Sequence, residues 1–164
     1  MKKWYVLILT VVFLNGCGAQ PTFETIDDDQ SLLVSATIRQ ISLALPKEAA
    51  KPTMESSGGS LYICNGYTLA IETFSGGNLN RTVQQITGYT LDRVQYMKTG
   101  TADIARYDLV WTTAGEGGDQ VARAVILDDG FNHYVVSVMA EAAIAGDLQD
   151  TWQTLLSSVT LRTD

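Results

Sequence analysis

Two long apolar segments joined by Asp129-Gly130 constrain the fold of this chain more than any other feature of its sequence. Residues 120–128 read QVARAVILD and residues 131–142 read FNHYVVSVMAEA. Asp-Gly between two apolar runs is a strong signal for a β-hairpin, because such tight turns need residues that tolerate positive φ. The stretches AVIL and YVVSVMA are apolar at successive positions, and successive strand side chains face opposite sides of a sheet. We therefore predict a hairpin within a sheet that is covered on both sides.

Other strands precede this hairpin. Asn65-Gly66 separates residues 61–64 from residues 67–74 and predicts a second antiparallel hairpin, in which both turn residues tolerate positive φ. Residues 92–99 and 102–114 also have strand composition, and a glycine-rich turn is predicted over residues 115–119.

The start of the domain is predicted to hold two short strands. Apolar residues alternate with small polar ones over residues 34–38 and again over residues 41–45. Pro46 is expected to end the second strand, because proline cannot donate a hydrogen bond to a ladder. Residues 47–60, with Pro52 and two adjacent glycines, are predicted to form a loop.

One helix is predicted between the second hairpin and the later strands. Leu79, Val83 and Ile86 are spaced for one helical face. Asn78 is expected to cap the N-terminus of this helix, and Gly88 to follow its C-terminus in the left-handed conformation.

A second amphipathic helix is predicted near the end of the sequence. Its apolar stripe consists of Leu148, Trp152, Leu155, Leu156 and Val159. Asp147 is expected to be its N-cap, with Asp150 as the capping-box partner. Residues 159–162 are expected to close the domain as a short extended piece.

This order of elements predicts an α+β fold over residues 31–164, with a single antiparallel sheet and helices packed on its faces. The order resembles that of the Mog1/PsbP-like fold, an α/β/α sandwich that also includes small bacterial lipoproteins. The resemblance rests on the ISLALP segment, the long central hairpins and the closing WQTLLSSVTL segment, and it covers about residues 32–161. It implies a role in binding, assembly or scaffolding, because members of this fold are mostly not enzymes. No functional residue is carried over, since a fold alone does not give function.

The first residues have the organisation of a bacterial leader. Lys2 and Lys3 precede an apolar run over residues 4–14, which is shorter than the roughly 20 residues that a membrane-spanning helix needs. A basic region, a short apolar region and small residues together indicate a signal peptide.

The end of this leader, Leu14-Asn15-Gly16-Cys17, resembles a bacterial lipobox, although Asn15 departs from the small or hydroxylated residue usual there. The resemblance implies that Cys17 receives a diacylglyceryl group and that cleavage removes residues 1–16. Two acyl chains are enough for stable membrane anchoring. The alternative is an ordinary secretory signal with an incidental cysteine.

Residues 17–30 are predicted to be the lipidated N-terminus and a flexible acidic tether. Thirteen flexible residues have an r.m.s. span of roughly 20 Å, which separates the domain from the lipid head groups. Asp27, Asp28 and Asp29 are interpreted as a solvated spacer, because the run lacks the alternating ligands and the turn glycine of a calcium loop.

The charge balance restricts the partners of this chain. Without Lys2 and Lys3, nine Lys/Arg residues face eighteen Asp/Glu residues. Nucleic acid is therefore not an expected partner, since binding to phosphates needs basic residues. The expected partners are the membrane, through the lipid anchor at Cys17, and a protein of the cell envelope.

The sequence contains no recognisable catalytic or cofactor motif, and we expect neither an enzyme nor a metal or cofactor site. His133 is the single histidine, and no G-x-S-x-G nucleophile elbow is present. His133 is interpreted as a strand residue, and Cys64 as a buried structural thiol. Three glycine pairs, residues 58–59, 76–77 and 117–118, are interpreted as turns and not as phosphate loops.

The expected function is that of an extracytoplasmic lipoprotein, anchored either to the outer leaflet of the cell membrane or to an outer membrane, that acts as a binding or assembly module. One alternative is a solute-binding protein with a pocket between the sheet and a helix. Another is a hydrolase centred on His133 or Cys64.

The anchor can be tested with radiolabelled palmitate in a bacterial host. We expect the wild-type chain to incorporate label and to fractionate with the membrane, and we expect Cys17→Ser to lose both properties, because acylation requires the thiol. Cys64→Ser is the matched control and should keep the label. Equal labelling of the wild type and Cys17→Ser would contradict the lipobox interpretation.

Overall fold

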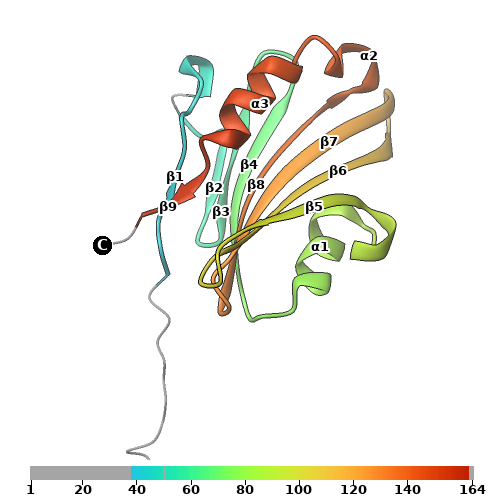
Figure 1. Ribbon diagram of the computed structural model, residues 1–164. Helices are drawn as coiled ribbons and strands as arrows, with labels where there is room; N and C mark the ends of the chain where they lie inside the picture. The colour runs from blue at the N-terminus through green and yellow to red at the C-terminus, as the bar shows by residue number, and fades with distance from the viewer. Residues whose placement is uncertain (1–37, 50, 163–164) are drawn as a thin grey trace, which may run out of the picture. The chain divides into compact units, whose positions relative to one another are not determined.

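The computed structural model describes residues 38–49 and 51–162, and its main feature is a curved antiparallel sheet of seven strands in the order β2-β3-β4-β8-β7-β6-β5 (Figure 1). These strands are β2 (Met54–Ser56), β3 (Gly59–Ile63), β4 (Thr68–Ser75), β5 (Gln95–Gly100), β6 (Ala105–Gly115), β7 (Gly118–Asp128) and β8 (Asn132–Glu141). Strands β1 (Ile41–Ser42) and β9 (Thr160–Leu161) form a separate antiparallel pair. The helices are α1 (Leu79–Thr87), α2 (Ala142–Ala145) and α3 (Gln149–Ser157), with short 3-10 turns at Lys47–Ala49 and Leu91–Arg93.

This arrangement confirms the predicted α+β class. The prediction of a single sheet was wrong, because β1 and β9 pair with each other outside the seven-stranded sheet.

The hairpin of β7 and β8 lies near the middle of the sheet, as the sequence predicted. Val125 is opposite Val136, and Ile126 is opposite Val135. The first pair belongs to one buried apolar cluster and the second pair to another. Gly130 takes a φ of 86° in the turn, and the Asp129 carboxylate accepts hydrogen bonds from the backbone N–H groups of Phe131 and Asn132. The two central strands therefore bury side chains on both faces of the sheet.

Helix α3 contributes its apolar stripe to the first of these clusters. Trp152 and Leu155 are buried there with Val136, and Trp152 meets Tyr67 edge-on with ring centroids 6.2 Å apart. The predicted stripe is thus confirmed. The prediction that Asp147 is the N-cap of α3 was wrong. The N–H of Asp147 donates to the carbonyl of Ile144 in the turn after α2, and α3 begins two residues later without a side-chain cap.

The C-terminal end of α3 is attached to β6 by one arginine. The Arg106 guanidinium donates to the carbonyl oxygen of Leu156 at 2.9 Å and forms a two-point ion pair with Asp108 at 2.8 and 2.9 Å. A cation at this position is favourable because the carbonyl end of a helix carries a partial negative charge.

Helix α1 belongs to the second cluster and has the predicted ends. The Asn78 side chain accepts a hydrogen bond from the Arg81 N–H at 3.1 Å. Gly88 has a φ of 77° and donates to the Gln84 carbonyl. Val83 is fully buried with Leu109 of β6 and with other side chains of this cluster.

Several predicted boundaries differ from the structure. Residues 47–60 were predicted to be a loop but contain β2, which pairs with β3 from Met54 opposite Leu61. The strand predicted to begin at residue 92 begins at Gln95, because Leu91–Arg93 form a 3-10 turn.

The strand predicted over residues 41–45 is limited to Ile41–Ser42, since its partner β9 is only two residues long. In the second hairpin Gly66 has a φ of 82° while Asn65 does not take positive φ. The strand predicted over residues 34–38 falls largely outside the described residues.

Candidate functional site

A groove of about 790 Å³ lies beside the hairpin of β2 and β3. One wall is the segment over residues 38–45, and the other is the hairpin turn over residues 55–60. Its floor is formed by Tyr62 of β3 and Ile71 of β4, which stand on the same face of the sheet as the α3 cluster. We refer to this feature as the hairpin groove.

The wall over residues 38–45 is held in place by contacts that are distant in sequence. The N–H of Arg39 donates to the Tyr134 hydroxyl at 2.9 Å, and that hydroxyl donates to the Asp129 carboxylate at 3.0 Å. The N–H of Arg162 donates to the carbonyl of Gln40, and the N–H of Ala44 donates to the Ser158 hydroxyl. The start and the end of the described domain therefore meet at this wall.

The electrostatics of Asp129 agree with this geometry. Burial opposes ionisation of Asp129, but the N–H groups of Asn132 and Phe131 and the hydroxyl of Tyr134 outweigh it and lower the pKa of the carboxyl. Burial raises the pKa of the Tyr134 phenol. Tyr134 is therefore a neutral donor to a carboxylate at physiological pH.

The groove combines an apolar floor with a polar rim. Ile41 and Leu43 continue the apolar surface of the floor, whereas Gln40, Ser57 and Ser60 place hydrogen-bonding groups at its edge. Such a combination suits an extended chain segment, because apolar side chains fill the floor while backbone groups find partners at the rim.

This groove is not predictable from the loop signals over residues 47–60, because β2 lies within them and pairs with β3. A signal was present: Ser57-Gly58 is a turn dipeptide between two short segments able to form strands.

A smaller cavity of about 450 Å³ lies between the end of β4 and α1. It is lined by polar groups, among them Thr73, Arg81 and Gln85, and by the turn at Gly76 and Gly77. Its position between the sheet and a helix corresponds to the pocket that the solute-binding alternative expects.

His133 is buried against α1. The side chain is 0% exposed, and Nδ1 is hydrogen bonded to the Thr82 hydroxyl at 2.7 Å. Nε2 lies 3.7 Å from a carboxylate oxygen of Asp128, beyond hydrogen-bond distance. Asp128, His133 and Thr82 supply the carboxylate, imidazole and hydroxyl that a hydrolase triad contains. Thr82, however, is only 2% exposed. In this conformation the hydroxyl is closed off from a substrate.

Cys64 is buried in the α3 cluster, as the sequence interpretation expected. Burial raises the pKa of its thiol, the neighbouring Tyr67 hydroxyl opposes that rise, and the charge of Glu48 adds to it. A raised pKa reduces the thiolate fraction and therefore the nucleophilicity at neutral pH. The aromatic residues Tyr107, Trp111, Tyr134 and Trp152 are buried as well.

The other predicted site residues, Leu14, Asn15, Gly16 and Cys17, lie outside the described residues. Within residues 38–49 and 51–162, no group of three or more His, Cys, Asp or Glu side chains is placed to hold a metal ion. Over the same ranges, no helix has both the length and the apolar character needed to cross a membrane.

Comparison with known proteins gives a similarity of fold. No family model and no curated protein matches the sequence. A Pseudomonas aeruginosa protein of unknown function, PA94, has a TM-score of 0.51 at 11% identity, with 76% of this chain and 99% of that chain covered. A Bacteroides thetaiotaomicron structure has a TM-score of 0.50 at 14% identity, with 76% and 46% covered.

A third structure is LpqN of Mycobacterium tuberculosis, a protein described as involved in cell envelope biogenesis. It has a TM-score of 0.49 at 15% identity, with 76% of this chain and 84% of that chain covered. At identities this low, the structures with TM-scores of 0.50 and 0.51 indicate a shared architecture and leave function to be argued from the site.

The buried imidazole leads to a prediction of pH-dependent stability. Burial lowers the pKa of His133 below its ordinary value of 6.5, although the charges of Asp128 and Asp129 oppose this. Below pH 6.5 the unfolded chain therefore binds more protons than the folded one. The free energy of unfolding then decreases as the pH is lowered, by at most about 1.4 kcal/mol per pH unit. Urea unfolding of the full-length chain between pH 7.5 and 5.5 measures this slope.

His133→Gln is the matched variant for this measurement, since it retains hydrogen-bonding groups but does not titrate. We expect the wild type to lose more stability than this variant between pH 7.5 and 5.5. If both chains showed the same slope, the titration of His133 would not contribute to it.

Proposed function

We propose that this chain is a lipid-anchored, extracytoplasmic lipoprotein that acts as a binding or assembly module, and that the hairpin groove receives an extended segment of a protein partner. The observation that carries the proposal is the groove itself, with its apolar floor at Tyr62 and Ile71 and its polar rim. The leader ending at Cys17 supports the location, and the anchor follows from the lipobox resemblance.

The proposed architecture is that of the Mog1/PsbP-like α/β/α sandwich. Two observations support it: α1 and α3 contribute to different buried clusters, and neighbouring residues of β7 alternate between those clusters. The proposed role is non-catalytic, which agrees with the closed position of Thr82 and with the raised pKa of the Cys64 thiol.

A photo-crosslinking residue in the full-length protein tests the groove in intact cells. We expect p-benzoylphenylalanine at Ser57, on the exposed rim, to give one discrete adduct, because a bound segment would pass within reach of it. Thr99, which is exposed on β5, is the control position and should give none. Mass spectrometry of the adduct should locate the crosslink in an extended segment of the partner. Absence of an adduct at Ser57, or equal adducts at both positions, would contradict the proposal.

One observation supports a second candidate function, solute binding: the polar cavity between β4 and α1. A small ligand there should raise the melting temperature of the full-length chain in proportion to its occupancy. If such stabilisation were found and Arg81→Gln abolished it while Ser57 gave no adduct, the solute-binding function would replace the one proposed here.

A further inference from the structure

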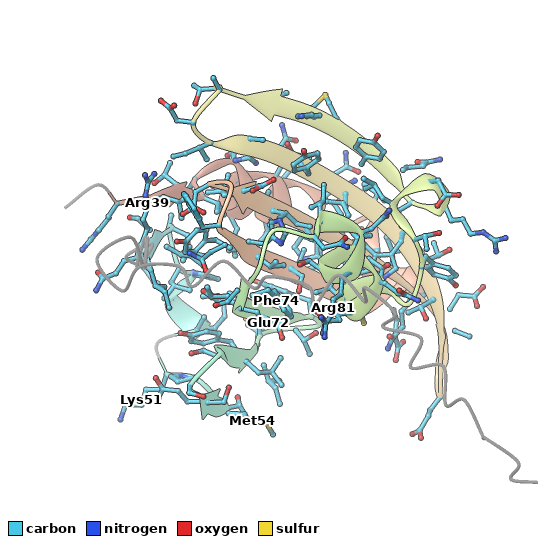
Figure 2. The ribbon with its side chains drawn as sticks, turned by 90° about the horizontal axis from the view of Figure 1, so that it is seen from below. Arg39, Lys51, Met54, Glu72, Phe74 and Arg81 are labelled. Carbon is cyan, nitrogen blue, oxygen red and sulfur yellow. The ribbon has the colours of Figure 1, made fainter. Side chains whose placement is uncertain are left out.

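A separate cleft of about 350 Å³ lies on the other face of the same hairpin. In the strand register Met54, Leu61 and Ala70 form one row across β2, β3 and β4, and Gly59 lies opposite Glu72 in the next row. Phe74 follows on β4, since alternate strand residues share a face. Figure 2 shows Glu72 and Phe74 on β4 and Met54 on β2.

The cleft is lined mainly by apolar side chains, with two serines, Ser56 and Ser60, and one charged residue, Glu72. Met54 is 67% exposed although it is a large apolar side chain, and Leu61, Ala70 and Phe74 are partly exposed around it. Exposed apolar side chains that gather around a hollow mark interaction sites more often than singly scattered ones.

Gly59 makes room for the one charged group in this cleft. A Cβ atom at residue 59 would lie 2.5 Å from the carbonyl oxygen of Ile71 and 3.0 Å from Cγ of Glu72. The missing side chain at residue 59 therefore leaves room for the Glu72 side chain beside β3. The result is a carboxylate set against an apolar floor.

The Glu72 carboxylate has no ionic partner within the described part of the chain, where Arg106 and Asp108 form the one ion pair between an arginine or lysine and a carboxylate. Glu72 is half-buried, and this burial raises the pKa of its carboxyl. A partly desolvated carboxylate is stabilised when a cation replaces the water that it has lost. The cleft is therefore complementary to a positive group carried on an apolar stem.

Among biological cations, the arginine side chain fits these features best. Its guanidinium is weakly hydrated, stacks on aromatic rings and binds a carboxylate through two parallel hydrogen bonds. Phe74 provides the ring, Glu72 the carboxylate, and Met54 an adaptable apolar side chain for the methylene stem. The acidic character of the whole chain also favours a basic partner surface.

We propose that the cleft formed by Met54, Leu61, Phe74 and Glu72 is a docking site for an arginine side chain of a protein partner. This site lies on the opposite face of the hairpin from the groove and does not depend on the groove being occupied. Residues 58–60 line both the cleft and the groove. Glu72 lines the cleft and does not line the groove.

The docking site is tested by titrating the ¹⁵N-labelled full-length chain in detergent with Nα-acetyl-arginine methylamide. We expect saturable shifts of the amide resonances of Gly59, Ala70 and Glu72. The neutral citrulline analogue should bind at least about tenfold more weakly, equivalent to about 1.4 kcal/mol. The lysine analogue should also bind more weakly, because its ammonium is strongly hydrated and cannot form the two parallel hydrogen bonds.

Glu72→Gln removes the charge and keeps the shape, so we expect it to lower the affinity for the arginine probe by about tenfold or more. Glu116→Gln is the matched control: it removes an exposed carboxylate from the turn between β6 and β7, outside both the cleft and the groove, and should leave the affinity unchanged. The proposal is overturned if the arginine probe produces no saturable shift, if the citrulline or lysine analogue binds equally well, or if Glu72→Gln binds like the wild type.

Discussion

The hydrogen-bonded pair β7–β8 is the interaction on which the rest of the structure depends. Four fully buried side chains, Val125, Ile126, Val135 and Val136, lie at its middle and alternate between the two apolar clusters. Full burial of an aliphatic side chain of this size contributes about 1.5–3 kcal/mol each. Helices α1 and α3 have their apolar stripes in different clusters, so disruption of this hairpin would remove the packing partner of both helices.

The candidate sites lie away from this centre, at the hairpin of β2 and β3. Strand β2 is an edge strand of three exposed residues, and the adjoining turn is a wall of both the groove and the cleft. Segments with few buried apolar contacts open locally at lower free energy than the core. A rigid centre with an adaptable edge suits a binding module, because the edge can adjust to a partner without disturbing the core.

The comparison between sequence and structure shows where local signals are sufficient. The ends of α1 were predictable from Asn78 and Gly88, because an N-cap and a left-handed glycine act within a few residues. The turn at Gly130 was predictable for the same reason. Asp147 does not cap α3, because the chain forms α2 immediately before it. The apolar spacing that predicts α3 gives no indication of a helix or turn in front of it.

The site was less predictable because it depends on pairing between distant segments. The groove exists only because residues 38–45 are held by Tyr134 and by the end of the domain, contacts that no local pattern encodes. Glu72 did have a signal: in LAIETF, alternation places it on one face between Ala70 and Phe74. Alternation alone could not predict that, within the described residues, strands and a turn line this cleft and no helix does.

The central claim, a rigid β7–β8 hairpin with an adaptable β2–β3 edge, is tested most directly by native-state hydrogen exchange of the full-length chain. The account predicts that amides of β7 and β8 around Val125 and Val136 exchange only through global unfolding, with a free energy equal to that measured by urea. Amides of Met54–Ser56 should exchange through local opening at a clearly lower free energy. Exchange of β8 amides as fast as those of β2, or protection of β2 equal to that of β8, would contradict it.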